Sequence, residues 1–151
     1  MHDPSTGFLA DIRTCARAVI LRGEEILVQV KTKPGRGTYL TLPGGKQDPG
    51  ETLHDCVIRE CAEEIGATVR VDRLLHVAEV FRRKPTGLRH QIDILFACRV
   101  DAGYVPRLGS HPDPSQIATA WMPLADAIGQ LSPAFGPALT GDSVYLGLCD
   151  A

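Results

Sequence analysis

The sequence predicts an α+β fold in a single domain that spans residues 1–151. Segments with the alternating pattern of β-strands dominate the chain, and one long amphipathic helix interrupts them near the middle. A second, shorter helix is expected late in the chain. The length of 151 residues is typical of one domain and is enough to bury a hydrophobic core.

The first elements form an expected hairpin, a loop and a short strand. In order, we expect a strand at 14–21, a turn at 22–24, a partner strand at 25–31, a loop rich in Gly, Pro and basic residues at 31–38, and an apolar strand at 39–42. The sequence Leu42-Pro43-Gly44-Gly45 then signals a turn. Its glycines allow the backbone to approach a ligand closely.

The long helix is predicted to begin after Thr52 and to end before Gly66. Thr52 is suited to cap the first turn, with Asp55 three residues later, and glycine accepts the left-handed conformation that ends helices. The apolar stripe of this helix consists of Leu53, Val57, Ile58, Cys61 and Ile65. This stripe predicts that one side of the helix packs on the sheet.

The second half of the chain again favours strands. We expect a strand at 69–81, a turn at 82–87, a strand at 89–100, a loop at 101–115, a short strand at 117–122 and a short helix at 124–131. Residues from 132 onward carry only a weak pattern.

Three glutamates of the long helix share one face. At about 100° per residue, Glu60, Glu63 and Glu64 fall within an arc of roughly 100°. Like charges this close disfavour joint ionisation, and Mg²⁺ or Mn²⁺ relieves the repulsion because hard cations prefer carboxylate oxygens. A solvated acidic helix face is the alternative for three glutamates considered alone.

These glutamates belong to a longer pattern with fixed spacing. Its fixed positions are Gly45, Glu51, Arg59-Glu60, Glu63-Glu64 and Gly66. Seven such matches arise by chance about once in 10⁸ starting points at average residue usage. The pattern matches the Nudix box, with Cys61 and Ala67 replacing larger aliphatic residues. The chain therefore resembles the Nudix hydrolases, which cleave diphosphate linkages in nucleoside diphosphates joined to another group.

The resemblance implies a fold, a cofactor and a set of site residues. The implied fold is a mixed β-sheet sandwiched between α-helices, and the implied cofactor is Mg²⁺ or Mn²⁺. Glu60, Glu63, Glu64 and the backbone of Gly44 would bind the metal, with Glu60 the first candidate for general base. Catalytic support would come from Arg59 and Glu51, which brace the loop and the helix through a salt bridge or hydrogen bonds.

Other residues are candidates for substrate binding. Arg17 interrupts an apolar strand, so its partner is either a substrate phosphate or an internal carboxylate. Arg82 belongs to a basic cluster near the expected turn, and a solvated loop is its alternative role. Tyr39 and Phe81 are candidates for stacking on a base, as is Trp121, although a packing role is favoured for each of them. Asp93 is a weaker candidate for an additional acidic ligand.

Composition excludes several other classes of protein. The net charge of −2 gives no global basic field that would bind a nucleic acid polymer. The sequence contains no run of 18 apolar residues, so we expect no membrane helix. The N-terminus lacks the basic start and apolar core of a secretory signal. Five cysteines without CxxC spacing favour a reducing compartment and argue against structural zinc, so we expect a cytoplasmic protein.

The substrate stays open at this level. A nucleoside triphosphate, an oxidised nucleotide and a nucleotide sugar are all compatible with the motif, as is a homodimer. Two alternative functions on the same fold are an isoprenoid-diphosphate isomerase and a non-catalytic nucleotide sensor. The complete set of motif glutamates favours the enzyme over the sensor.

Overall fold

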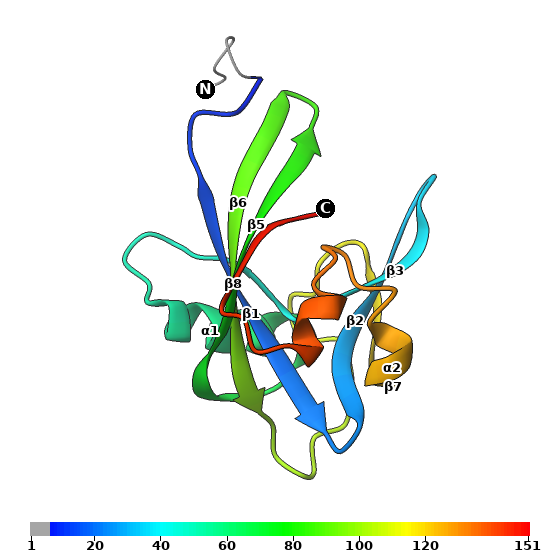
Figure 1. The fold of residues 1–151 in the computed structure, drawn as a ribbon. Helices are drawn as coiled ribbons and strands as arrows, with labels where there is room; N and C mark the ends of the chain where they lie inside the picture. The colour runs from blue at the N-terminus through cyan, green and yellow to red at the C-terminus, as the bar shows by residue number, and fades with distance from the viewer. Residues whose placement is uncertain (1–6) are drawn as a thin grey trace.

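The computed structural model describes residues 7–151, which form one mixed sheet with a long helix and two short helical segments (Figure 1). The elements are β1 (Arg13–Arg22), β2 (Glu25–Lys33), β3 (Gly37–Thr41), β4 (Gly44–Lys46), α1 (Leu53–Ile65), β5 (Arg70–Lys84), β6 (Gly87–Arg99), β7 (Gln116–Pro123), α2 (Leu124–Ala127), the 3-10 helix η1 (Gly136–Thr140) and β8 (Tyr145–Cys149). None of the helices in this part of the chain is long and apolar enough to cross a membrane.

The sheet separates between β1 and β2. The strand order is β3-β2-β1-β6-β5-β8, with β4 paired to β1 and β7 paired to β2. β1 and β2 are hydrogen-bonded only beside their turn, through the pairs Leu21↔Ile26 and Arg22↔Glu25. Farther along, β1 pairs with β4 instead, while β2 pairs with β3 and β7. The β2–β3 and β5–β6 hairpins therefore project as two separate arms (Figure 1).

Each face of the sheet has its own hydrophobic core. One core joins the sheet to α1 through Cys56, Val57, Cys61 and Ile65. The other joins the opposite face to Ala127, Leu131 and Phe135, which lie in and after α2. This arrangement confirms the predicted α+β class, with a mixed sheet between helical layers.

Both predicted ends of α1 are present. The Thr52 hydroxyl accepts a hydrogen bond from the Asp55 backbone N–H at 3.1 Å, and Gly66 adopts a left-handed φ of 63°. The predicted stripe is wrong at Ile58, which is 37% exposed, because Cys56 occupies the buried position instead. Burial raises the pKa of the Cys56 thiol to about 12, so this group is a packing side chain rather than a nucleophile.

Several predicted boundaries are also wrong. The expected turn at 82–87 shrinks to two residues because β5 continues through Lys84 and pairs with Gly87 of β6. The expected loop at 31–38 is likewise shorter, since β2 and β3 pair as far as Lys33↔Gly37. The α-helical part of 124–131 ends at Ala127. Strand β8 was not predicted, and it is held by parallel pairing to the distant β5.

Candidate active site

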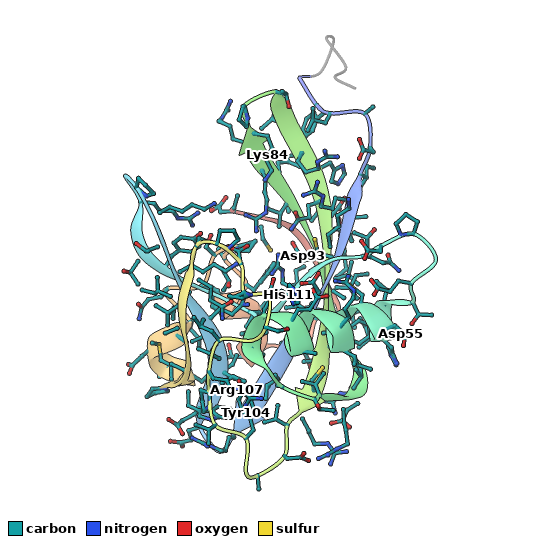
Figure 2. The ribbon with its side chains drawn as sticks, turned by 180° about the vertical axis from the view of Figure 1, so that it is seen from behind. Asp55, Lys84, Asp93, Tyr104, Arg107 and His111 are labelled. Atoms are coloured by element: carbon teal, nitrogen blue, oxygen red, sulfur yellow. The ribbon has the colours of Figure 1, made fainter. Side chains whose placement is uncertain are left out.

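Two of the three predicted helix glutamates line a cavity of about 430 Å³ that lies between the separated halves of the sheet. Glu60 and Glu64 lie one helical turn apart, and Gly44 and Gly45 of β4 form the adjacent wall. Figure 2 views this region from behind, with α1 below Asp93 and the hairpin that carries Lys84 above it. The β-strands and the helix thus bring residues from distant parts of the chain to one cavity.

The two glycines of β4 permit this close approach. A Cβ atom at Gly45 would lie 2.7 Å from the carboxyl carbon of Glu60, and one at Gly44 would lie 2.1 Å from the carbonyl oxygen of Ala16. Gly44 also has a φ of 144°, which L-residues rarely adopt. Glycine is therefore required at position 44 for β4 to lie against β1, and a side chain at position 45 would displace the Glu60 carboxylate.

Glu64 is a partly buried carboxyl group with an unusual pKa. Burial raises its pKa to about 7, and the negative charge of Glu60 contributes to the rise. A hydrogen bond from Gln29 and the positive charge of Lys31 oppose this shift. The positive charge near Glu60 and Glu64 therefore does not balance their negative charge, and a bound cation would supply the difference.

Gln29 is a site residue that sequence reasoning missed. It is fully buried, and its Nε2 donates to Glu64 Oε2 at 2.5 Å while its Oε1 accepts from Thr41 Oγ1 at 2.9 Å. These two bonds fix the orientation of the amide, so the N–H group faces Glu64. A polar residue between Val28 and Val30 was the available signal, the same one that singled out Arg17.

Arg59 forms a clamp between the helix and the loop before it. Its Nε and NH2 groups bind the two Glu51 carboxylate oxygens at 2.6 and 2.9 Å, which is the bracing salt bridge expected from the sequence. Its NH1 group contacts Glu60 at 3.0 Å and Glu63 at 3.3 Å. The hydrogen bonds from Arg59 hold the pKa of Glu51 near 2, so Glu51 stays ionised.

Glu63 differs from its two neighbours. Its side chain is 40% exposed and is directed to Arg59, and it is not among the residues that line the cavity. The predicted arc of three glutamates is thus divided in the fold, because Arg59 holds Glu63 on the outer side of the helix.

Arg17 has an internal partner. Its Nε lies 2.7 Å from Asp93 Oδ1, and its NH1 donates to the Leu42 carbonyl at 3.3 Å. Gln91 donates to the other Asp93 oxygen at 2.9 Å, and Asp93 is fully buried. Although burial alone would lower the pKa of Arg17, the neighbouring Asp93 raises it, so Arg17 stays charged. Arg17 still lines the cavity beside this pair.

The other substrate-binding candidates occupy different places. Arg82 and Tyr39 line the cavity, and the Arg36 guanidinium lies 4.0 Å above the Tyr39 ring. Phe81 does not line it, because successive side chains of β5 point to opposite sides. Phe81 packs instead against Phe8 at a ring distance of 4.8 Å. Trp121 lies beneath Arg22, whose guanidinium is 4.1 Å from its ring.

The loop at 101–115 holds the C-terminal end of α1. The backbone N–H groups of Gly109 and His111 donate to the carbonyls of Glu64 and Glu63 at 2.9 and 2.8 Å. The Tyr104 hydroxyl donates to the Ile65 carbonyl at 2.5 Å. Figure 2 shows Tyr104 and His111 on this loop beside the helix. The loop thereby satisfies carbonyl groups that a helix end leaves free.

A second, larger cavity of about 550 Å³ lies between the other ends of β1, β5 and β6. It contains none of the predicted site residues and is lined partly by leucines, including Leu74, Leu75 and Leu139. The smaller cavity is the candidate active site because it contains both acidic and basic groups suited to a metal and a phosphate.

The donor set of the smaller cavity fits a hard divalent cation. Glu60 and Glu64 supply adjacent carboxylates, and the backbone of Gly44 lies in the same wall. Within residues 7–151, no three His, Cys, Asp or Glu side chains form a complete metal cluster. Mg²⁺ usually takes only one or two protein carboxylates and completes its shell with water and substrate phosphates, so this partial set is appropriate.

Comparisons with known proteins agree with this geometry. The family model described as the NUDIX domain matches residues 12–139. An ADP-ribose pyrophosphatase of Methanocaldococcus jannaschii is 38% identical over 78 residues, which are 52% of this chain and 44% of that protein. An 8-oxo-dGDP phosphatase of Homo sapiens is 31% identical over 100 residues, covering 66% of this chain and 28% of that protein. The chain thus spans less than half the length of these relatives.

Solved structures show the same fold. A MutT NUDIX hydrolase from Burkholderia pseudomallei superposes with a TM-score of 0.67 at 28% identity, over 88% of this chain and 99% of that one. A NUDIX hydrolase from Nitrosomonas europaea gives a TM-score of 0.69 at 17% identity, over 90% of this chain and 94% of that one, which is a likeness of fold alone. With the family model matching most of its length, the chain belongs to the Nudix hydrolase family.

Proposed function

We propose that this protein is an Mg²⁺- or Mn²⁺-dependent pyrophosphohydrolase that cleaves the diphosphate linkage of a nucleoside diphosphate joined to another group. The observation that carries the proposal is the composition of the smaller cavity. Two adjacent glutamates lie at one wall, and seven Lys and Arg side chains line the same space. Carboxylates of this kind suit a divalent cation, and the basic groups suit phosphates.

In this proposal Glu60, Glu64 and the Gly44 backbone would hold the metal, with Glu63 contributing once Arg59 releases it. When bound, the cation neutralises developing negative charge on the phosphates and lowers the pKa of a coordinated water. Glu60 is the candidate proton acceptor for that water, as the resemblance implies. Arg59 and Glu51 keep Glu60 in place through the contacts that join loop and helix.

Hydrolysis consumes one water molecule. A bond forms between the water oxygen and one phosphorus atom, the bridging P–O bond breaks, and the water proton passes to the general base. Arg82 and Tyr39 would contact the substrate, and their position in the cavity lining supports this role. Arg17 is held by Asp93, so any phosphate contact it makes would use its remaining N–H groups.

The proposal extends to the setting of the enzyme. We take residues 1–151 as one catalytic domain that acts on a small nucleotide-type substrate rather than on a nucleic acid polymer. Five free cysteines, four of them buried, are compatible with a reducing compartment such as the cytoplasm.

A substrate panel tests this function. The purified protein is incubated with nucleoside triphosphates, an oxidised nucleotide, nucleotide sugars and ADP-ribose, each with Mg²⁺, with Mn²⁺ or with excess chelator, and both products are identified. We expect cleavage between two phosphates in the presence of metal only, and loss of that cleavage in Glu64→Gln. Absence of metal-dependent cleavage across the panel would contradict the proposal.

A further inference from the structure

The cavity that contains Glu60 and Glu64 has a large local excess of positive charge. Its lining contains three acidic residues, Glu60, Glu64 and Asp113, and seven basic ones, Arg13, Arg17, Lys31, Lys33, Lys46, Arg82 and Lys84. The whole chain carries a net charge of −2, so this excess belongs to the cavity and not to the general surface.

Most of these basic groups have no internal partner. Arg17 is paired with Asp93 at 2.7 Å, and Lys31 lies 3.8 Å from Asp113. The remaining basic side chains form no hydrogen bond or ion pair with any residue in the described range 7–151; they are Arg13, Lys33, Lys46, Arg82 and Lys84. Unpaired cations that line one concave site are available for a mobile anion.

Strand geometry places the unpaired cations on two facing arms. Arg82 and Lys84 are two residues apart on β5, so they share one side of that strand. Lys33 lies at the end of β2, on the arm across the gap that separates the two hairpins (Figure 1). Figure 2 shows Lys84 on the projecting β5–β6 hairpin, farther from α1 than Asp93 is. The positive charge thus continues outward from the glutamates.

The basic side chains repel one another when no anion is bound in the cavity. Burial lowers the pKa of Arg82, and the charge of Arg17 lowers it further. Lys84 is exposed to solvent, and its partial desolvation lowers its pKa slightly, with the charge of Arg82 acting in the same direction. An anion among these groups would relieve the repulsion, as a cation would between Glu60 and Glu64.

We propose that the preferred substrate carries a phosphate beyond the scissile diphosphate, and that Arg82 and Lys84, with Lys33 opposite, bind this additional group. The substrate class is therefore a nucleoside polyphosphate with three or more phosphates, in preference to a nucleotide sugar or ADP-ribose, whose second moiety is neutral. This inference rests on the proposed function and narrows it. A metal held by the glutamates would neutralise the scissile diphosphate, and the outer cations would remain for a further phosphate.

The test compares substrates that share a base but differ in the second moiety. We would measure kcat/KM for ATP against ADP-ribose and for GTP against GDP-mannose, with Mg²⁺, for wild type, Arg82→Gln and Lys84→Gln. Arg83→Gln is the matched control, because Arg83 is an adjacent exposed arginine of β5 that does not line the cavity. Thermal unfolding of each variant verifies that it is folded.

We expect kcat/KM to be about tenfold higher for ATP than for ADP-ribose, or for GTP than for GDP-mannose. Arg82→Gln and Lys84→Gln should each lower triphosphate kcat/KM by about 5- to 30-fold, mainly through KM, and change diphosphate kcat/KM less than about twofold. Added salt should lower kcat/KM for the triphosphates more strongly than kcat/KM for ADP-ribose or GDP-mannose. Arg83→Gln should match wild type.

Two results would overturn the inference while leaving the proposed function intact. One is metal-dependent cleavage of nucleotide sugars or ADP-ribose as fast as that of triphosphates. The other is a loss of triphosphate kcat/KM in Arg83→Gln as large as that in Arg82→Gln and Lys84→Gln, which would indicate a general effect of surface charge. If none of the four nucleotides is cleaved with metal present, and the wider panel is also inert, the proposed function fails and the inference fails with it.

Discussion

At the scale of single residues, Glu64 links stability to function. Its side chain is partly buried beside Glu60, and these surroundings disfavour its charged form despite the hydrogen bond from Gln29, so a nearby cation would stabilise that form. The metal-free protein therefore holds a carboxyl group whose environment opposes ionisation. Binding sites often lower stability in this way, because their groups are arranged for a ligand rather than for one another.

The first prediction concerns Glu64→Gln. The folded pKa of about 7 lies above the ordinary value of 4.5, so the stabilising contribution of protonated Glu64 is complete below pH 4.5 and is lost as pH rises through 7. At pH 8 without metal, the neutral variant should be more stable than wild type by about 1–3 kcal/mol. This gain should disappear toward pH 4, and activity should be lost throughout.

Urea unfolding at both pH values measures the effect. Glu24→Gln serves as control, because Glu24 is exposed, and it should change stability little at either pH. A metal-free Glu64→Gln protein that is less stable than wild type at pH 8 would contradict this view of the Glu64 carboxyl group.

The second prediction concerns Arg17. Arg17→Ala would leave Asp93 buried with only Gln91 as a partner, so the free energy of unfolding should fall by about 3–5 kcal/mol. Replacing both members, as in Arg17→Met with Asp93→Leu, should recover much of this loss. Arg70→Ala is the control, since its ion pair with Asp101 is exposed and should contribute less than about 1 kcal/mol.

Steady-state kinetics on Arg17→Ala separates the structural role from substrate binding. A large loss of stability with kcat/KM intact would make Arg17 purely structural. A tenfold or larger loss of kcat/KM with unchanged stability would contradict the ion-pair account and favour a phosphate contact.

At the scale of elements, the loop at 101–115 determines how the end of α1 is held. Its backbone and the Tyr104 hydroxyl bind carbonyl groups of the last helical turn, which carries Glu63 and Glu64. Sequence pattern identified the segment as a loop but gave no sign of this function, because the contacts join residues about 40 positions apart. The loop is thus part of the site although it does not contact the glutamate carboxylates.

The third prediction is that Gly109→Ala weakens both stability and metal affinity. A Cβ atom at this position would lie 2.2 Å from the Glu63 carbonyl oxygen, so the loop must move away from the helix. We expect the free energy of unfolding to fall by about 1–3 kcal/mol and the Mg²⁺ concentration for half-maximal activity to rise. Gly103→Ala is a control in the same loop, because nothing lies within 4 Å of its added Cβ atom. Equal stability and equal Mg²⁺ affinity of the Gly109→Ala and Gly103→Ala variants would contradict this role of the loop.

Sequence reasoning succeeded for elements whose signals are local and failed where pairing is distant. The caps of α1 depend on Thr52 and Gly66 themselves, so they were predictable. Strand β8 depends on its pairing to β5, about 68 residues away at Val77↔Tyr145, and its own pattern is weak. The β5–β6 hairpin extends past its expected turn for the same reason, since cross-strand pairing decides where a strand ends.

At the scale of the whole molecule, the separation of β1 from β2 brings the site together. β4 enters beside β1 and carries Gly44 and Gly45 to Glu60, while the two projecting hairpins bring basic residues to the opposite walls. The motif located the glutamates without this information. The partners of Arg17 and the role of Gln29 were not accessible, because Asp93 and Glu64 become neighbours only when distant strands and the helix pack.

The most direct test of the central claim is hydrolysis in H₂¹⁸O, followed by ³¹P NMR of both products from the best substrate of the panel. We predict that ¹⁸O enters one phosphate product through cleavage between two phosphates, that this requires Mg²⁺ or Mn²⁺, and that Glu64→Gln abolishes it. Full turnover in excess chelator, or products in which neither phosphate carries ¹⁸O, would contradict metal-assisted attack of water on phosphorus.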